Sequence, residues 1–271
     1  MAAVLPSLSK DMKITTWNVN SVNARLDHLK KLIKYKKSDI YFLQELKCLN
    51  DFFPTNEIEK LGYHCYVNGQ KAWNGVAILS KKKLDIINNK IPTFDKDQQS
   101  RFIETEIKIP NLKKKVRLIC IYLPNGNPID TEKFDYKIEW MKKFNKYILS
   151  LYKKDIPIII GGDFNVIPTD DDVYSPENFK NDACAHPKTR EQFRVLINYG
   201  FTDIIKNFQK GKTNWTFWGY RGGGWQKGNG LRIDHFLVTP EISDLIIKTS
   251  IDREPRSWEK ASDHTPVVLE I

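Results

Sequence analysis

Residues 157–165 read PIIIGGDFN and contain the features that decide the fold. Three consecutive isoleucines favour a buried β-strand, because branched side chains pack well on a pleated surface. Two glycines and the polar residues Asp163 and Asn165 follow where this strand should end. Adjacent glycines form either a plain turn or a place where the backbone approaches another group closely. The polar residues behind them favour the second interpretation.

Other short apolar runs on both sides of this segment have the length and β-branched content of strands. They cover residues 13–17, 39–43, 75–79, 116–123, 157–160, 233–238 and 265–269. Residues 102–109 alternate apolar and polar side chains, as a half-buried strand does. Apolar residues recur at helical spacing over 22–36, 131–152 and 190–199, and Thr131 is an acceptable N-cap. The mixture predicts an α/β sandwich of two sheets packed face to face, with helices outside.

The chain has 271 residues, with 43 Lys and Arg against 33 Asp and Glu, and a formal net charge of +10. An apolar content of 41% and a charged content of 28% exclude a disordered or collagen-like chain. We expect one domain over residues 12–271, preceded by a non-essential extension over residues 1–11. No apolar run reaches the roughly 18–20 residues of a membrane helix. The positive charge favours a polyanionic partner.

The four cysteines are widely spaced and form no C-x-x-C pair, which argues against a zinc site or a disulfide framework. The N-terminus lacks the basic region and apolar run of a signal peptide. These features predict a cytoplasmic protein with reduced thiols. We also expect no membrane association and a monomeric state.

Polar side chains recur within or just beyond the predicted strands. They are Asn18, Asn20, Glu45, Lys47, Tyr122, Asn125, Asp163, Asn165, Asp234, Asp263 and His264. A carboxylate in or beside a buried strand is costly unless it is paired or bound to a cation. Several carboxylates in equivalent places therefore predict one shared site.

Each of these residues also has an ordinary interpretation when taken alone. Asn18 and Asn20 suit turns, and Glu45 suits a solvated strand end. Asp263 beside His264 suits a helix cap next to an unrelated histidine. The remaining histidines have no comparable setting, and we interpret them as structural or surface residues. The combination, rather than any single residue, favours a site.

The residue types fit metal-assisted hydrolysis of a phosphodiester. Glu45 with an Asn or Asp neighbour suits Mg²⁺, which prefers oxygen ligands, with Mn²⁺ as a possible substitute. Asp163 can align and deprotonate a water molecule, and Asn165 can orient it.

A phosphoryl oxygen in such a site needs hydrogen-bond donors. His264 paired with Asp234 would be one donor, and this pairing would raise the pKa of the imidazole. Tyr122 and Asn125 can also donate to phosphate.

Seven segments in order resemble the exonuclease III family of apurinic/apyrimidinic endonucleases, of bacterial type, within the endonuclease/exonuclease/phosphatase superfamily. They read WNVNSVNARL, FLQELK, NGVAILS, YLPNG, GGDFNV, GLRIDHFLV and SDHTPV, and the resemblance covers essentially residues 12–271. GDFN alone is moderately specific and SDH alone is weak, but the ordered set is highly specific. The resemblance implies a four-layered α/β sandwich of two mixed β-sheets, with the site at one end of the paired sheets.

The resemblance also implies a reaction. Members of the family use Mg²⁺ to incise duplex DNA on the 5′ side of an abasic site, leaving a 3′-hydroxyl and a 5′-deoxyribose phosphate. They often add 3′→5′ exonuclease, 3′-phosphatase and 3′-phosphodiesterase activity. The expected partner is therefore duplex DNA with abasic sites or blocked 3′ ends.

By motif, the resemblance implies a role for each residue. It assigns the metal to Glu45, Asn20 and Asp263. It assigns the chemistry to Tyr122, Asp163, Asn165, Asp234 and His264. It assigns DNA contacts to Asn18, Arg25, Lys47, Arg101, Asn125, Phe217, Trp218, Arg221, Leu231 and Ile233, of which Phe217, Leu231 and Ile233 resemble the apolar pocket for the flipped abasic sugar. For the Trp and Tyr cluster around Trp218, ordinary core packing remains open.

The chain departs from the family pattern at three places. Asn74 lies where some relatives have a DNA-contacting aromatic, and Asn23 lies at a position that is often Arg. The loop after YLPNG reads NPID and lacks the Arg that some relatives insert into the duplex. These changes affect groove insertion and the balance of endonuclease and exonuclease activity, and leave the chemistry unchanged.

Two other functions remain open from sequence. One keeps the fold but hydrolyses an inositol phosphate or a phospholipid. The other is a non-catalytic DNA-binding module, for which damaged carboxylates would be expected. The basic charge and the intact acids favour the nuclease over both.

Overall fold

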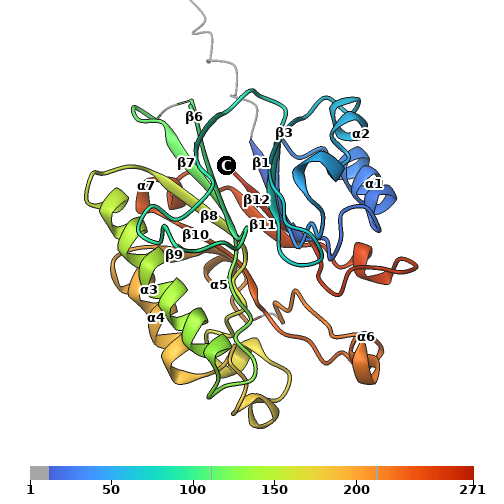
Figure 1. Cartoon of the computed structure of the whole chain (residues 1–271), viewed down its shortest axis with the longest axis vertical. Helices are drawn as coiled ribbons and strands as arrows, with labels where there is room; N and C mark the ends of the chain where they lie inside the picture. The colour runs from blue at the N-terminus through green and yellow to red at the C-terminus, as the bar shows by residue number, and fades with distance from the viewer. Residues whose placement is uncertain (1–11, 111, 212) are drawn as a thin grey trace, which may run out of the picture.

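The computed structural model describes residues 12–110, 112–211 and 213–271, so the predicted extension over 1–11 lies outside the described residues. Two six-stranded sheets pack face to face (Figure 1). The first sheet has the order β11 (Lys248–Ile251), β12 (Val267–Glu270), β1 (Lys13–Asn18), β2 (Ile40–Gln44), β4 (Val76–Ser80), β3 (His64–Asn68). The second has the order β5 (Asp85–Asn88), β6 (Phe102–Ile107), β7 (Val116–Tyr122), β8 (Ile158–Asp163), β10 (Asp234–Val238), β9 (Thr202–Asp203).

Each sheet contains one parallel pair at its centre. In the first sheet β1 runs parallel to β2, and in the second β7 runs parallel to β8. The other pairings are antiparallel, so both sheets are mixed. The carboxyl ends of a parallel pair meet at one edge of the sheet, and this edge is where the polar residues of the sequence motifs follow the strands.

Helices cover the two outer faces, which completes the four predicted layers. α1 (Leu26–Lys36) and α2 (Thr55–Glu59) lie on the side of the first sheet, and α3 (Glu132–Tyr152) and α4 (Pro187–Asn198) lie on the side of the second (Figure 1). The short helices are α5 (Ile204–Phe208), α6 (Gly224–Lys227) and α7 (Pro240–Ser243). Within the described ranges, no helix is both long and apolar enough to cross a membrane.

Three apolar layers hold the sandwich together. The layer between the sheets includes Ile14, Phe42, Ile159 and Phe236, all buried. A second layer lies between α3, α4 and the second sheet, and a third lies between α1 and the first sheet. Burial of this apolar area is the main stabilising contribution to the fold.

The eight strands predicted from sequence are all present, with ends shifted by up to three residues. The prediction of a half-buried strand at 102–109 is wrong, because β6 is buried on both faces. Ile103 packs in the layer between the sheets, while Phe102 packs under α3. Glu104 is completely buried there and accepts hydrogen bonds from Arg117 at 3.2 Å and the Tyr147 hydroxyl at 2.6 Å.

The predicted helices differ from the observed ones mainly at their first residues. α1 begins at Leu26 rather than residue 22, because the amides of Ser21 and Val22 donate to the carbonyls of Glu45 and Leu46. α4 begins at Pro187 rather than residue 190, since His186 caps it by accepting from the Lys188 amide at 3.2 Å. α3 follows Thr131, as predicted, although the Thr131 hydroxyl donates to the carbonyl of Pro128.

A buried polar network lies at the start of β10, around Arg232 and His235. Arg232 donates to Asp172 at 2.8 Å and to Asp203 at 2.7 Å. His235 is completely buried, donates from Nε2 to the carbonyl of Val166 and accepts at Nδ1 from Arg232. Both ring nitrogens are thus used by the neutral imidazole. Burial and the neighbouring Arg232 cation lower the pKa of His235 to about 4.

This pKa predicts an acid-dependent loss of stability. The unfolded chain takes up a proton at His235 near pH 6.5, whereas the folded chain does so only near pH 4. The stabilisation is therefore complete above pH 6.5 and declines as the pH falls toward 4. Between pH 7.5 and 5 we expect this residue to cost about 2 kcal/mol in the free energy of unfolding.

Urea unfolding at both pH values, with His235→Gln beside the parent, checks this expectation. The variant should be less stable at pH 7.5 but should show a smaller decline on acidification. His64→Gln is the matched control, because His64 is exposed on β3. Equal declines in the parent and His235→Gln would remove His235 as the source.

Candidate active site

The carboxyl ends of four strands bring the candidate catalytic residues together. Asn18 ends β1 and Glu45 directly follows β2, both in the first sheet. Tyr122 ends β7 and Asp163 ends β8, at opposite positions in the second sheet. The face-to-face packing of the sheets places these ends at a common rim, so the residues predicted to share a site lie close together.

Asn18 connects the two sheets at this rim. Its side-chain nitrogen donates to Glu45 Oε1 at 2.9 Å and to Asp163 Oδ2 at 2.9 Å. Its side-chain oxygen Oδ1 accepts from the main-chain amide of Asn20 at 3.0 Å. The assignment of Asn18 to DNA contact does not fit this position, because the side chain is completely buried and its polar atoms are engaged. Its contacts instead suit the positioning of two carboxylates.

Asp234, His264 and Asp163 form a second chain of contacts. His264 Nδ1 donates to Asp234 Oδ2 at 2.9 Å, and Nε2 faces Asp163 Oδ2 at 3.6 Å. The Thr216 hydroxyl donates to Asp234 Oδ2 at 2.6 Å and fixes that carboxylate from the other side. Burial opposes the charge on His264, but Asp234 and Asp163 outweigh it and raise its pKa to about 10. His264 is therefore a charged donor near neutral pH.

Asp163 is completely surrounded by protein and titrates near neutrality. Burial raises its pKa to about 7, against the opposing effect of His264, and the carboxylates of Asp234 and Glu45 add to the rise. The amide of Asn165 donates to Asp163 Oδ1 at 2.9 Å and fixes its orientation. A carboxylate with such a pKa can accept and release a proton at physiological pH.

Glu45 has a different electrostatic setting. Burial alone would favour its neutral form, but Lys47 and Asn18 overcome this effect and lower its pKa. Lys47 Nζ lies 2.9 Å from Glu45 Oε2 and also bonds the side-chain oxygen of Asn20. Asn20 in turn donates to Asp263 Oδ1 at 3.0 Å. The three residues assigned to the metal therefore lie together, with Lys47 bound between two of them.

Among the described residues, the side chains that converge as possible metal ligands share only Glu45 with this predicted set. Glu45, Asp163 and His264 each offer a ligand atom within 4.8 Å of the others. Asp263 is not one of these three, although its partner Asn20 lies beside Glu45 through Lys47. Carboxylate oxygens at the end of buried strands form a centre of negative charge in a chain of net charge +10.

Tyr122, Arg101 and Asn125 line an open cavity of about 520 Å³ next to the carboxylates. The Arg101 guanidinium lies 4.8 Å from the centre of the Tyr122 ring and donates to the Tyr122 carbonyl. Burial and the nearby Glu45 and Asp163 raise the pKa of Tyr122 well above its usual value. The phenol therefore stays protonated and can act as a donor.

Asn125 and Asn165 meet across the two loops that follow β7 and β8. Asn125 Nδ2 donates to Asn165 Oδ1 at 3.1 Å, and Asn165 Nδ2 donates to the Leu123 carbonyl. Asn165 has a φ of 47°, a left-handed conformation that Asn tolerates better than most residues. The exposed Asn125 side chain thus lies beside the water-orienting candidate.

Of the three residues expected to bind the flipped sugar, Phe217 lies beside His264. The Phe217 ring is 4.9 Å from the His264 ring. Leu231 and Ile233 are buried in a small apolar cluster against which the partly buried Phe217 packs. Only Phe217 of the three presents substantial surface to the site.

The assignment of Trp218 to DNA contact is wrong for the structure as it stands. Its side chain is 2% exposed and packs edge-to-face on Trp225, so the alternative of core packing holds.

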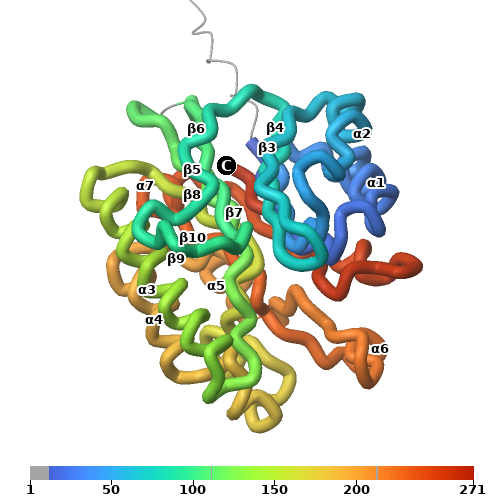
Figure 2. The backbone as a smooth tube through the Cα atoms, viewed as in Figure 1, coloured from blue at the N-terminus to red at the C-terminus, as the bar shows by residue number. Residues whose placement is uncertain are grey.

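Arg221 is exposed at the start of the Gly-rich loop that carries α6 away from the body of the sandwich (Figure 2). Arg25 is partly buried and donates to the carbonyls of Asn20 and Lys260, which favours a role in holding the first loop.

The sequence interpretation missed Trp73, which is 70% exposed at the mouth of the same cavity. The residues on either side, Ala72 and Asn74, both have positive φ, and this tight turn leaves the indole on the surface. Asn74 itself is buried and donates to Gln70 and Gln99. An aromatic residue one position before NGV was the available signal. Asn23 is exposed and donates to the Phe52 carbonyl.

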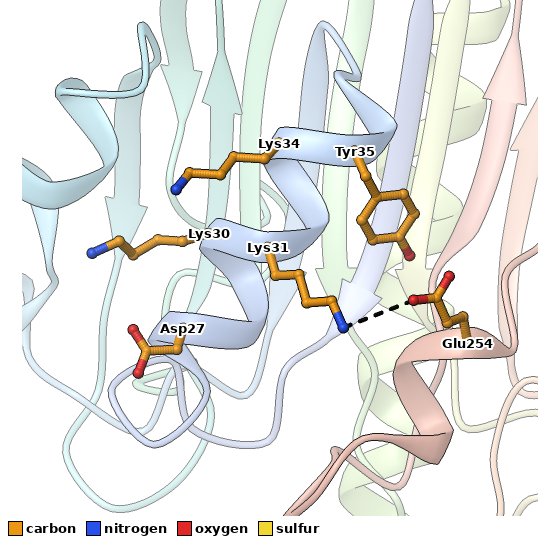
Figure 3. Close-up of a pocket in the computed structure, with 6 residues that line it drawn as sticks. All are labelled: Asp27, Lys30, Lys31, Lys34, Tyr35 and Glu254. Atoms are coloured by element: carbon orange, nitrogen blue, oxygen red, sulfur yellow. Dashed lines mark ion pairs between the residues drawn. The ribbon is translucent and has the colours of Figure 1, made fainter.

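A larger hollow of about 740 Å³ lies elsewhere, on the outer face of α1. Figure 3 shows its lining of α1 side chains, with Lys31 paired to Glu254 at 3.8 Å. Solvated lysines on one helix form no convergent set of catalytic groups. Volume alone therefore does not locate the chemistry in this molecule.

Comparisons with known proteins identify the family of this chain. The chain matches the model of the Endonuclease/Exonuclease/phosphatase family over residues 15–264. It is 32% identical over 270 residues to exodeoxyribonuclease III of Haemophilus influenzae, covering 96% of this chain and 99% of the relative. The structure of the 3′ phosphatase NExo from Neisseria, bound to a product DNA hairpin, gives a TM-score of 0.90 at 35% identity, covering 96% of this chain and 99% of that chain.

An AP endonuclease from Archaeoglobus fulgidus gives a TM-score of 0.88 at 34% identity, covering 95% of this chain and 98% of that chain. These similarities extend over nearly the whole of both chains, so they concern the complete fold. The chain therefore belongs to the endonuclease/exonuclease/phosphatase family, as its sequence motifs predicted.

Proposed function

We propose that this protein is a metal-dependent DNA-repair nuclease that incises duplex DNA on the 5′ side of abasic sites. We include 3′→5′ exonuclease and 3′-phosphatase activity on DNA ends in the proposal. The observation that carries it is a pair of carboxylates, the partly buried Glu45 and the buried Asp163, joined by Asn18 and faced by His264. The names of similar proteins, exodeoxyribonuclease III and AP endonuclease, support the same reaction class.

The donor set fits Mg²⁺. Oxygen atoms dominate it, and such hard ligands suit Mg²⁺ better than metals that prefer thiolates. Glu45 would be the principal ligand, with Asn20 and Asp263 as further oxygen donors. When bound, the cation would neutralise charge on the phosphate and act as a Lewis acid. Lys47, which now pairs with Glu45, would then be free to contact the DNA backbone.

Hydrolysis forms a bond between a water oxygen and phosphorus and breaks the bond from phosphorus to the 3′ oxygen. Asp163 accepts the proton of the water, for which its pKa near 7 is well placed. Asn165 orients the water, while Asp234 holds His264 in its charged form. His264, Tyr122 and Asn125 donate hydrogen bonds to the phosphoryl oxygens, and the departing 3′ oxygen gains a proton to become a hydroxyl.

The surroundings of the site favour DNA as the substrate. Phe217 beside His264 offers an apolar wall for a sugar that lacks a base, and such a nucleotide is inexpensive to extrude from the duplex. Arg101, Lys133 and the exposed Trp73 line the adjoining cavity and suit a phosphate backbone and a base face. The net charge of +10 favours the backbone as well.

A duplex oligonucleotide with one abasic analogue tests the proposed reaction. We expect a single cut on the 5′ side of the analogue, a 3′-hydroxyl product, loss of activity in EDTA and recovery with Mg²⁺. A 3′-phosphorylated and a 3′-recessed duplex, assayed in parallel, report the end-directed activities. Indifference to all three DNAs, with hydrolysis of inositol phosphates or phospholipid instead, would overturn the substrate assignment.

Two substitutions test the assigned chemistry. Asp163→Asn removes the base, and His264→Ala removes the charged donor, so each should lower the rate constant for incision by about 100-fold or more. Asp244→Asn changes an exposed carboxylate and should leave the rate unchanged. Circular dichroism establishes that each variant is folded. A rate within a few-fold of the parent removes the substituted residue from its role.

A further inference from the structure

Lys137 on α3 is a buried cation that the proposed chemistry does not use. Its side chain has no exposed surface. Lysine is rarely buried completely, because its ammonium group loses its hydration. Burial lowers the pKa of Lys137 accordingly. A residue this costly to bury must make contacts that repay the lost hydration.

Those contacts go to the two loops that carry the phosphate and water residues. Lys137 Nζ donates to the main-chain carbonyl of Asn165 at 2.6 Å and to that of Asn125 at 3.0 Å. The same two residues meet through their side chains on the other side, where Asn125 donates to Asn165. The loops that follow β7 and β8 are thus joined twice, once at the site and once beneath it.

The aliphatic part of Lys137 packs closely against Gly126 in the loop that follows β7. Gly126 has a φ of 84°, and a Cβ atom there would lie 2.5 Å from Lys137 Cδ and 3.3 Å from Ala183 Cβ. The YLPNG segment therefore needs glycine at this position, both for its conformation and for the passage of the lysine. Asn127 connects the same loop to the segment around Asp182 and Ala183, since it accepts from the Ala183 amide and donates to Asp182.

The bond to Asn165 reaches the base of the proposed reaction in one further step. Asn165 is in the left-handed conformation, and its own amide donates to Asp163 Oδ1 at 2.9 Å. Holding the Asn165 carbonyl from below fixes the residue whose amide orients Asp163. The bond to Asn125 fixes the loop that carries the phosphate donors in the same way.

We propose that Lys137 is a positioning residue that sets the relative placement of the two catalytic loops, and so of Asp163 and Asn125. This inference rests on the proposed nuclease function. In this proposal Lys137 touches neither substrate nor metal and acts through the main chain of the two loops. Displacement of reacting groups by about 1 Å lowers enzymatic rates by roughly 100-fold, so loss of this brace should appear in the rate of the chemical step.

Lys137→Met tests the proposal, because methionine fills the path of the aliphatic chain but donates no hydrogen bond. We expect the single-turnover rate of incision to fall about tenfold or more, while affinity for the abasic duplex, measured in EDTA, stays within about threefold. Lys142→Met is the matched control, as Lys142 is exposed on the same helix. It should change neither quantity.

Amide hydrogen exchange of the protein without DNA gives a second readout, independent of activity. In Lys137→Met, segments 123–127 and 163–167 should both exchange faster, while the rest of β7 and β8 keeps its protection. If this variant does not fold, Lys137→Gln, which retains a donor of shorter reach, carries the same measurements. An unchanged rate, faster exchange in one loop only, or affinity that falls as much as the rate would each overturn the proposal.

The two proposals fail in different ways. If the parent protein cuts none of the DNA substrates, the proposed function fails, and the exchange measurement still decides whether Lys137 joins the loops. If the parent cuts abasic DNA and Lys137→Met cuts it equally fast, only the positioning role fails.

Discussion

The hydrogen bonds of one amide, that of Asn18, join the two sheets at the rim where the chemistry is proposed. Asn18 and Glu45 belong to the first sheet and Asp163 to the second, and the Asn18 nitrogen contacts both carboxylates at 2.9 Å. This geometry requires that the sheets pack in one register, since a shift of a few ångströms would separate the acids. The apolar layer between the sheets, from Ile14 to Phe236, therefore determines the site as well as the stability of the fold.

Concentrating acids at this rim conflicts with burial, and the fold resolves the conflict residue by residue. Glu45 is kept charged by Lys47, while Asp163 moves toward neutrality and Asp234 is stabilised by His264 and Thr216. The pKa of Glu45 is lowered and that of Asp163 is raised because their partners differ. The same surroundings hold His264 protonated, so an acid and a base coexist 3.6 Å apart.

The sequence could predict the centre of each sheet but not its borders. The four strands that escaped prediction, β3, β5, β9 and β11, are the two outermost strands of each sheet. Edge strands need not be apolar on both faces, and β5 exposes Asp85 and Ile86, so no apolar run marks them. Motif order similarly predicted that Glu45, Asp163, Asp234 and His264 lie together, as they do in the structure. Whether Asn18 and Trp218 face solvent depends on packing between distant segments, which spacing does not encode.

The two glycines that precede Asp163 show how packing and site share one constraint. A Cβ atom on Gly161 would lie 2.5 Å from the Phe236 ring, and one on Gly162 would lie 2.0 Å from the Ile121 carbonyl. Gly162 also has a φ of 152°, which side chains rarely adopt. Any larger residue would force β8 away from β7 and β10, and Asp163 is the next residue along the chain. The glycines therefore set the position of Asp163 by allowing β8 to pack closely in the sheet. The close approach that the sequence suggested is an approach to the protein's own core.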